Sequence, residues 1–243
     1  MRQAMIFAAG LGTRLRPLTD TMPKALVCVG GKPLLAHVLQ RIKEAGFERA
    51  VVNVHHFPQQ IISYLNDNPV DGLQVLVSDE SDALLETGGG IRKAFPLFSS
   101  DSNILIHNVD ILSNVDLADF YQQAMTGQAT LLVSERSTSR YLLFDDEMRL
   151  VGWTNIKTGE VRSPYPDFNP NDYRPYAFSG IHVISPELVA AMSDWPSRFS
   201  IIDFYLAVCD KCSIRGVVRQ DLRLLDVGKT DTLHEAEEFL KSL

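Results

Sequence analysis

The sequence predicts an α/β fold: a single Rossmann-like domain with a mostly parallel, mixed sheet flanked by helices. In the first half of the chain, apolar strand-like runs alternate with helical segments, a pattern typical of a parallel sheet covered on both faces. From about residue 129, strand-like runs follow one another without helices between them, which indicates a small β-rich lobe on the substrate side. We therefore expect one domain over 1–243, divided at about 1–128 and 129–243.

The expected elements follow from hydrophobic periodicity and from the turn residues between them. In the first half, apolar runs predict strands at 4–7, 50–54, 73–77 and 103–107. Apolar residues at helical spacing predict helices at 33–42, 58–66, 87–95 and 117–125, of which the second opens on Pro58. In the second half we expect strands at 129–133, 141–144, 150–153 and 176–184, and helices at 186–192, 201–209 and 230–240.

Composition narrows the class of protein. With 243 residues, 45% hydrophobic and 22% charged, the chain is typical of a globular protein with a substantial core. Its net charge of −7 argues against nucleic acid as a partner, and no apolar run is long enough to span a membrane. The N-terminus shows no signal peptide and three cysteines cannot build a disulfide framework, so we expect a cytoplasmic protein. A monomer and a homo-oligomer both fit the sequence.

The loop after the first strand, residues 8–24, carries the chemistry of a phosphate site. Gly10 and Gly12 lack a Cβ, so neighbouring backbone N–H groups can close on an anion. Arg14, Arg16 and Lys24 add three cationic side chains to the same loop. Backbone donors together with positive charge are what a polyphosphate requires. A strand-to-helix turn that merely uses glycine is the alternative interpretation.

Two better-known phosphate loops do not fit these residues. A dinucleotide-binding fingerprint needs a third glycine at the position of Leu15. A P-loop needs Gly-Lys followed by Ser or Thr, whereas Gly31-Lys32 is followed by Pro33. The loop therefore belongs to neither of these classes.

Aspartates stand at two strand ends that are far apart in sequence. Asp110 comes just after strand 103–107, and Asp226 stands on an apolar run before the last expected helix. Carboxylate oxygens suit Mg²⁺, and two strand-end carboxylates can converge on one ion. Aspartates also end strands as turn formers or helix caps, and this structural role stays open for both residues.

A further glycine-rich stretch, residues 85–90, opens a helix. Gly88, Gly89 and Gly90 would let a flat base lie against the backbone and would expose helix N-terminal N–H groups. A helix start with a tight turn is the alternative interpretation.

Together these features resemble the signature of the sugar-phosphate nucleotidyltransferases, also called NDP-sugar pyrophosphorylases. The family pattern Ala-Ala-Gly-x-Gly-Thr-Arg-Leu-x-Pro-Leu-Thr, with a later Pro-Lys, stands at 8–24, and the Asp-Val-Gly motif stands at 226–228. The Glu-Thr-Gly-Gly-Gly form at 86–90 is similar to the MurU-type branch, which acts on N-acetylmuramate-1-phosphate. The chain departs from the family at Val109, where glycine is more frequent. The resemblance implies the nucleotide-diphospho-sugar transferase fold.

The resemblance also implies a role for individual residues. Arg14 and Lys24 are the expected catalytic cations, and Asp110 and Asp226 are expected to hold a catalytic Mg²⁺. Nucleotide contacts are expected from Ala8, Ala9, Gly10, Gly12, Thr13, Glu86, Thr87 and Gly88. Sugar-phosphate contacts are expected from Asn108, Lys157, Ser179 and Gly180. Lys157 is matched by position alone, and an exposed turn lysine is the competing interpretation.

The implied reaction condenses an NTP, expected to be UTP, with a sugar-1-phosphate, expected to be N-acetylmuramate-1-phosphate or a related hexose-1-phosphate. The products are an NDP-sugar and pyrophosphate. Two alternatives stay open: a cytidylyltransferase that acts on phosphocholine or another phosphomonoester, and a non-catalytic regulatory protein that binds nucleotide sugars.

Overall fold

The computed structural model of the chain describes residues 1–124, 127–229 and 231–243. Met125 and Thr230, which the sequence places at the end of one helix and the start of another, lie outside the described residues. In the described parts, no helix is long and apolar enough to cross a membrane.

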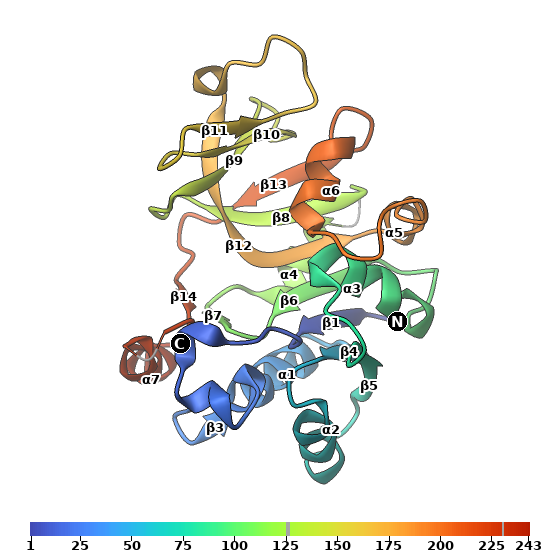
Figure 1. Cartoon of the computed structure of the whole chain (residues 1–243), viewed down its shortest axis with the longest axis vertical. Helices are drawn as coiled ribbons and strands as arrows, with labels where there is room; N and C mark the ends of the chain where they lie inside the picture. The colour runs from blue at the N-terminus through green and yellow to red at the C-terminus, as the bar shows by residue number, and fades with distance from the viewer. Residues whose placement is uncertain (125–126, 230) are drawn as a thin grey trace.

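A ten-stranded sheet runs through both halves of the chain (Figure 1). β1 (Gln3–Phe7) lies between β6 (Ile104–Asn108) and β4 (Arg49–Val54), and β5 (Gln74–Asp79) follows β4; these four strands are parallel. Their apolar side chains alternate between two buried faces, and in β1 Ile6 packs in one core cluster whereas Met5 packs in the other. Because both faces are covered, the strands read as continuous apolar runs in the sequence.

The second half of the chain adds antiparallel strands to this sheet. The last residues of β12 (Arg174–Ile184) pair with β6, and its first residues pair with β9 (Arg140–Phe144). β12 therefore connects the β-rich upper part of Figure 1 to the parallel strands below it. β10 (Leu150–Asn155) and β11 (Glu160–Arg162) follow beyond β9. β8 (Ala129–Ser134) pairs with β12, and β13 (Ile214–Val218) pairs with the other edge of β8.

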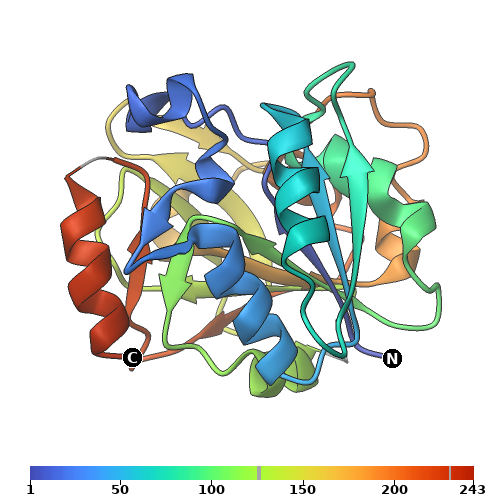
Figure 2. The same ribbon diagram turned by 90° about the horizontal axis from the view of Figure 1, so that it is seen from below.

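Helices cover both faces of the sheet, and Figure 2 shows α1 and α2 in front of the strands. One face packs against α1 (Leu34–Glu44), α2 (Pro58–Asp67), α4 (Leu117–Gln123) and α7 (Thr232–Lys241). The other face packs against α3 (Glu86–Ala94), α5 (Pro186–Ala190) and α6 (Ile201–Val208). The mixed sheet flanked by helices that the sequence predicts is thus observed.

The predicted strands and helices are present with small shifts at their ends. The strand expected at Asp226 is present as β14 (Leu224–Asp226). The structure adds strands that were not predicted from the sequence: β2 (Cys28–Val29), β3 (Lys32–Pro33), β7 (Ile111–Ser113), β11 and β13. It also adds short 3₁₀ helices: η1 (Thr13–Leu15), η2 (Leu18–Asp20), η3 (Lys24–Leu26), η4 (Phe95–Leu97) and η6 (Pro170–Asp172). Two or three residues show no periodicity, which is why most of these elements leave no trace in the sequence pattern.

Candidate active site

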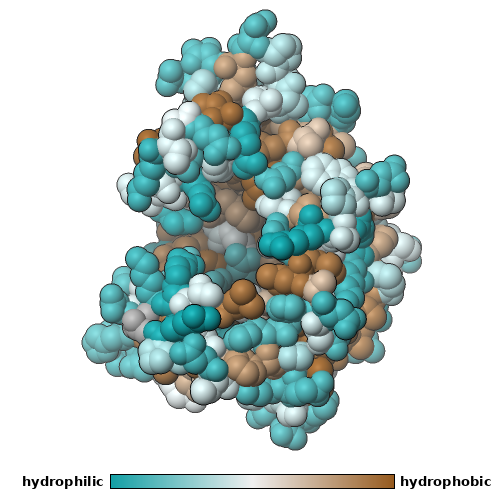
Figure 3. Space-filling model, viewed as in Figure 1, coloured by the Kyte–Doolittle hydropathy of each residue, from teal (hydrophilic) through white to brown (hydrophobic). Residues whose placement is uncertain are grey.

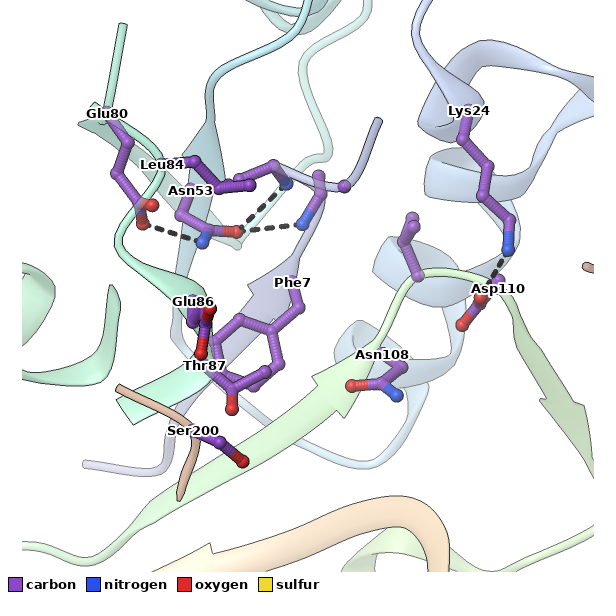
Figure 4. Close-up of a pocket in the computed structure, with 14 residues that line it drawn as sticks. Phe7, Lys24, Asn53, Glu80, Leu84, Glu86, Thr87, Asn108, Asp110 and Ser200 are labelled. Atoms are coloured by element: carbon purple, nitrogen blue, oxygen red, sulfur yellow. Dashed lines mark hydrogen bonds and ion pairs between the residues drawn. The ribbon is translucent and has the colours of Figure 1, made fainter. Parts of the chain in front are cut away.

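A cavity of about 420 Å³ opens where β1 and β6 end, at the carboxyl edge of the parallel strands (Figure 4). Eight residues singled out in the sequence line it: Ala8, Ala9, Gly10, Lys24, Glu86, Thr87, Asn108 and Asp110. Six others complete the lining: Phe7, Asn53, Glu80, Leu84, Val109 and Ser200. The space-filling view shows this side of the molecule hollowed between its upper and lower parts (Figure 3).

Two buried polar side chains hold the loop after β1 in place. Asn53 Oδ1 accepts hydrogen bonds from the backbone nitrogens of Ala8, at 2.8 Å, and Ala9, at 3.3 Å. Asn53 Nδ2 donates to Glu80 Oε1 at 2.7 Å, and Glu80 Oε2 accepts from the Leu85 nitrogen at 3.3 Å. Burial raises the pKa of the Glu80 carboxyl, and these two hydrogen bonds oppose the shift. This pair was not predicted from the sequence, where its signal is an asparagine inside an otherwise apolar strand.

The nucleotide contacts expected from Ala8 and Ala9 stay predictions, and Asn53 already accepts from both of their N–H groups. Both residues line the cavity, but their N–H groups already donate to Asn53 and are not free to close on a phosphate. Gly10 is the open part of the loop, because a Cβ there would meet no atom within 4 Å.

Gly12 serves close packing. Its φ is +63°, and a Cβ there would lie 2.9 Å from Thr19 Cγ2 and 3.0 Å from Lys24 Cβ. The absence of a side chain thus lets the loop lie against the base of Lys24. Thr13 and Arg14 follow in η1, exposed and outside the cavity lining.

Lys24 and Asp110 form an ion pair at the cavity wall, with Lys24 Nζ donating to Asp110 Oδ2 (Figure 4). Lys24 comes from the loop after β1 and is 8% exposed, whereas Asp110 follows β6. Removing either partner of such a sheltered pair would leave an uncompensated charge, so each residue fixes the position of the other.

A short two-stranded sheet brings Asp226 to Asp110. β14 pairs antiparallel with β7, which begins directly after Asp110, and the Val227 nitrogen donates to the Asp110 carbonyl at 2.9 Å. Burial and the negative charge of Asp110 raise the pKa of the Asp226 carboxyl. The two aspartates that the sequence separates by more than a hundred residues therefore lie within electrostatic reach of each other.

Three cations oppose that rise in the pKa of Asp226: Lys24, Arg14 and Arg136. Arg14 Nη2 lies 4.0 Å from Asp226 Oδ2. Gly228 leaves room for this approach, since a Cβ there would lie 2.9 Å from Arg14 Nη2. Arg136 was not among the residues that the sequence analysis assigned to the site.

The donor chemistry of Asp110 and Asp226 fits Mg²⁺. This ion is commonly held by one or two protein carboxylates, with water and substrate phosphates as its other ligands. Over residues 1–124, 127–229 and 231–243, no group of three or more His, Cys, Asp or Glu side chains could hold a metal ion. Metal binding by the aspartate pair stays a prediction.

The glycines that open α3 serve packing within the protein, which corrects the expected role of their N–H groups. The Gly88 and Gly89 nitrogens donate to the Phe199 carbonyl at 2.9 and 3.3 Å. A Cβ on Gly88 would lie 2.2 Å from Phe199 Cε2, and one on Gly89 would lie 2.4 Å from the Ser197 carbonyl oxygen. Gly88 is buried and outside the cavity lining, and its expected contact with a nucleotide stays a prediction.

Glu86 and Thr87 do line the cavity, and they tie α3 to the segment before α6. Thr87 Oγ1 accepts from the Ile201 nitrogen at 2.9 Å. Glu86 Oε1 accepts from Arg198 Nε at 2.9 Å, and Glu86 has a φ of +60°, which is uncommon outside glycine.

The expected sugar-phosphate residues divide into those near the cavity and one away from it. Asn108 lines the cavity, and Gly180, with φ +74°, approaches it so closely that a Cβ would lie 2.8 Å from Asn108 Nδ2. Ser179 is buried next to Gly180. Lys157 is exposed in the turn between β10 and β11 and does not line the cavity, as the competing interpretation of an exposed turn lysine requires.

The fold defines the class of protein. HddC of Yersinia pseudotuberculosis superposes with a TM-score of 0.76 at 23% identity, covering 99% of this chain and all of the other. UDP-glucose pyrophosphorylase of Acinetobacter baumanii superposes with a TM-score of 0.77 at 16% identity, covering 98% and 92%. The expected nucleotide-diphospho-sugar transferase fold is confirmed.

The sequence comparisons then define the family. The chain belongs to the nucleotidyl transferase family, whose sequence model matches residues 3–141. The chain is 32% identical to N-acetylmuramate alpha-1-phosphate uridylyltransferase of Caulobacter vibrioides, over 90% of this chain and 89% of that protein. It is 34% identical to UTP–glucose-1-phosphate uridylyltransferase of Synechocystis, over 96% of this chain and 62% of that protein.

Proposed function

We propose that this protein is a Mg²⁺-dependent enzyme that transfers the uridylyl group of UTP to N-acetylmuramate-1-phosphate or a related hexose-1-phosphate. The broader activity, condensation of an NTP with a sugar-1-phosphate, is the one that the names of the Caulobacter and Synechocystis relatives describe. The observation that carries the proposal is the Lys24–Asp110 pair at the cavity wall, joined to the Asp226 segment by a backbone hydrogen bond.

The reaction needs little covalent help from the protein. A phosphate monoester is largely ionised near neutral pH, so an oxygen of the sugar phosphate can attack the α-phosphorus without a general base. A new P–O bond forms there while the bond to the β-phosphate oxygen breaks, and pyrophosphate leaves. Lys24 would stabilise the charge on the α-phosphate, and Arg14 would bind the leaving β- and γ-phosphates. Catalysis then rests on positioning and charge neutralisation.

Asp110 and Asp226 would hold the Mg²⁺, which when bound adds positive charge at the reacting phosphates. The chain's own contribution is to orient both carboxylates. Lys24 pairs with Asp110, and Arg14 lies beside Asp226.

The choice of UTP and N-acetylmuramate-1-phosphate is supported by the Caulobacter relative, which aligns with nine-tenths of the chain, and by the Glu-Thr-Gly-Gly-Gly sequence at 86–90. A cytoplasmic location, and independence from nucleic acids and membranes, stay predictions.

The proposal is tested by pyrophosphate release from UTP, CTP, GTP and dTTP, each combined with four sugar-1-phosphates and with phosphocholine. We expect the highest rate with UTP and N-acetylmuramate-1-phosphate, loss of activity with EDTA, and recovery on adding excess Mg²⁺. Release only from CTP with phosphocholine would establish the cytidylyltransferase alternative. Nucleotide binding without release from any pair would favour the regulatory alternative.

Variants of the aspartate pair test the site itself. Asp110→Asn and Asp226→Asn should each lower kcat by at least roughly a hundredfold, because each removes a charge that organises the reacting phosphates. Asp101→Asn, at an exposed turn outside the cavity lining, is the matched control and should keep full activity. Circular dichroism and thermal unfolding establish that all variants are folded, and near-normal turnover in either site variant would reject the metal-pair assignment.

A further inference from the structure

We infer that Arg136 binds an anionic group of the sugar-phosphate acceptor, in the role that the family resemblance, by position alone, implied for Lys157. The inference rests on the proposed function, since it concerns the acceptor of that reaction. Arg136 follows β8, whereas Lys157 stands in the turn between β10 and β11. The second half of the chain would therefore supply its cation from a different element than expected.

The backbone of β12 holds the Arg136 side chain, which is itself outside the lining of the active-site cavity. Arg136 Nη2 donates to the Phe178 carbonyl at 2.9 Å. Phe178 stands where the register of β12 against β8 shifts, and this shifted stretch contains Gly180. Gly180 packs against Asn108, which lines the cavity. Because Phe178 stands two residues before Gly180, this hydrogen bond holds the guanidinium close to the part of β12 that packs against Asn108.

The charge of Arg136 is available to a ligand. Arg136 is exposed and forms no ion pair within the part of the chain that the structure describes. In contrast, Arg149, Arg162 and Arg174 of the same half each pair with a carboxylate. The field of Arg136 reaches Asp226, where it acts together with Lys24 and Arg14. A guanidinium has five N–H donors, so the bond to Phe178 leaves others for an oxyanion.

A buried hydroxyl group in the same cavity as Arg136 points to the same ligand chemistry. Arg136 and Ser134 line a second cavity of about 440 Å³. Ser134 is 7% exposed, and its Oγ has no hydrogen-bond partner among the described residues. Buried polar atoms are normally hydrogen-bonded, so an oxygen-rich ligand in this second cavity would complete the Ser134 hydroxyl.

The anion has two possible sources on the acceptor. N-acetylmuramate-1-phosphate carries a phosphate and a lactyl carboxylate, and a guanidinium can bind either one through two parallel hydrogen bonds. Both groups are oxyanions: the carboxylate is planar and the phosphate is tetrahedral. An acceptor without the carboxylate, N-acetylglucosamine-1-phosphate, distinguishes them.

The test compares Arg136→Ala, Arg136→Lys and the control Arg174→Ala, an exposed arginine on β12 paired with Asp146. Arg136→Ala should raise the acceptor KM roughly ten- to a hundredfold, the usual effect of losing a charged hydrogen-bond donor. The KM for UTP and the thermal midpoint should change little, Arg136→Lys should recover part of the loss, and Arg174→Ala should behave as the unsubstituted enzyme. Loss with both acceptors identifies the phosphate, and loss with N-acetylmuramate-1-phosphate alone identifies the carboxylate.

Calorimetric titration of the acceptor, with Mg²⁺ and α,β-methylene-UTP present, separates this inference from the proposed function. If the unsubstituted protein binds the acceptor but shows no turnover, and Arg136→Ala abolishes that binding, the proposed reaction is rejected. The assignment of Arg136 is then retained. Unchanged acceptor binding and KM in Arg136→Ala would overturn the assignment. A parallel loss of thermal stability and of UTP affinity would also overturn it, since that pattern indicates a structural role at β12.

Discussion

At the scale of single residues, Asn53 connects the strands of the sheet to the substrate loop. Its side-chain oxygen accepts hydrogen bonds from the Ala8 and Ala9 nitrogens, and its side-chain nitrogen donates one to Glu80. Asn53→Ala leaves these buried groups without partners, which should lower the free energy of unfolding by about 1–3 kcal/mol. Because the loop is then released, UTP affinity should fall as well. Urea denaturation and calorimetric UTP titration measure the two effects.

Asn171→Ala is the matched control for this substitution. Asn171 is exposed, and its side chain bonds only to the neighbouring Asn169 among the described residues. Stability and UTP affinity should therefore stay unchanged in the control. If Asn53→Ala were as stable as the control and bound UTP normally, the loop would not depend on Asn53 for its shape.

The sequence predicted the charged residues of the site better than the backbone donors. Lys24 and Asp110 could be recognised because their charge is required by phosphate chemistry wherever the chain places them. Nucleotide contacts were expected from Ala8 and Gly88, and in the structure Asn53 and Phe199 accept hydrogen bonds from the N–H groups of these residues. Whether a backbone donor is free depends on side chains and carbonyls from other elements, and local sequence does not contain that information.

At the scale of elements, α3 is fitted to the segment before α6 through glycine. A Cβ on Gly89 would lie 2.4 Å from the backbone oxygen of Ser197, which cannot rotate away as a side chain can. Gly89→Ala should therefore lower the free energy of unfolding by about 1–3 kcal/mol through overpacking. Gly10→Ala is the comparison for stability alone, since a Cβ at Gly10 meets nothing within 4 Å. Equal unfolding midpoints for the two variants in urea would show that the α3 contact accommodates the added methyl group without a loss of stability.

Short strands set the limit of prediction at this scale. The long strands and helices were predicted because their periodicity extends over several residues. An apolar strand was expected at Asp226, but β7 has only three residues, too few for a pattern, and its pairing with β14 is what places Asp226 beside Asp110. The convergence of the two aspartates could be proposed from chemistry and from resemblance, whereas the element that achieves it could not.

At the scale of the whole molecule, the sheet buries one histidine on each face. His107 is next to Ile106 on β6 and packs on the opposite face from it, and His182 on β12 shares the face of Ile106. Burial lowers the pKa of His182 from 6.5 to about 3, and burial together with the charge of Arg41 lowers that of His107 to about 4. Both rings are therefore neutral in the folded protein at pH 5.

These shifts predict that acid destabilises the fold. Each folded-state pKa lies below the unfolded value of 6.5, so the unfolded chain binds more protons between the two values. The stabilising contribution is complete above the unfolded pKa and is lost as the pH falls below it. Between pH 7 and pH 5 each histidine should remove about 2 kcal/mol from the free energy of unfolding. This figure depends on the unfolded pKa, because neither folded-state ring titrates within that range.

His182→Leu isolates one of the two contributions, since it replaces a buried ring by an apolar side chain and leaves His107 near the active site unchanged. Urea denaturation of the variant at pH 7 and pH 5 should show a loss smaller by about 2 kcal/mol than in the unsubstituted protein. His234→Gln, on the exposed surface of α7, should leave the acid dependence as it is. An identical loss in His182→Leu and the unsubstituted protein would mean that the folded protein can take up a proton at His182. The apolar packing between β12 and α6 would then have to admit water or a counter-charge, although burial is the cause of the lowered pKa at this position.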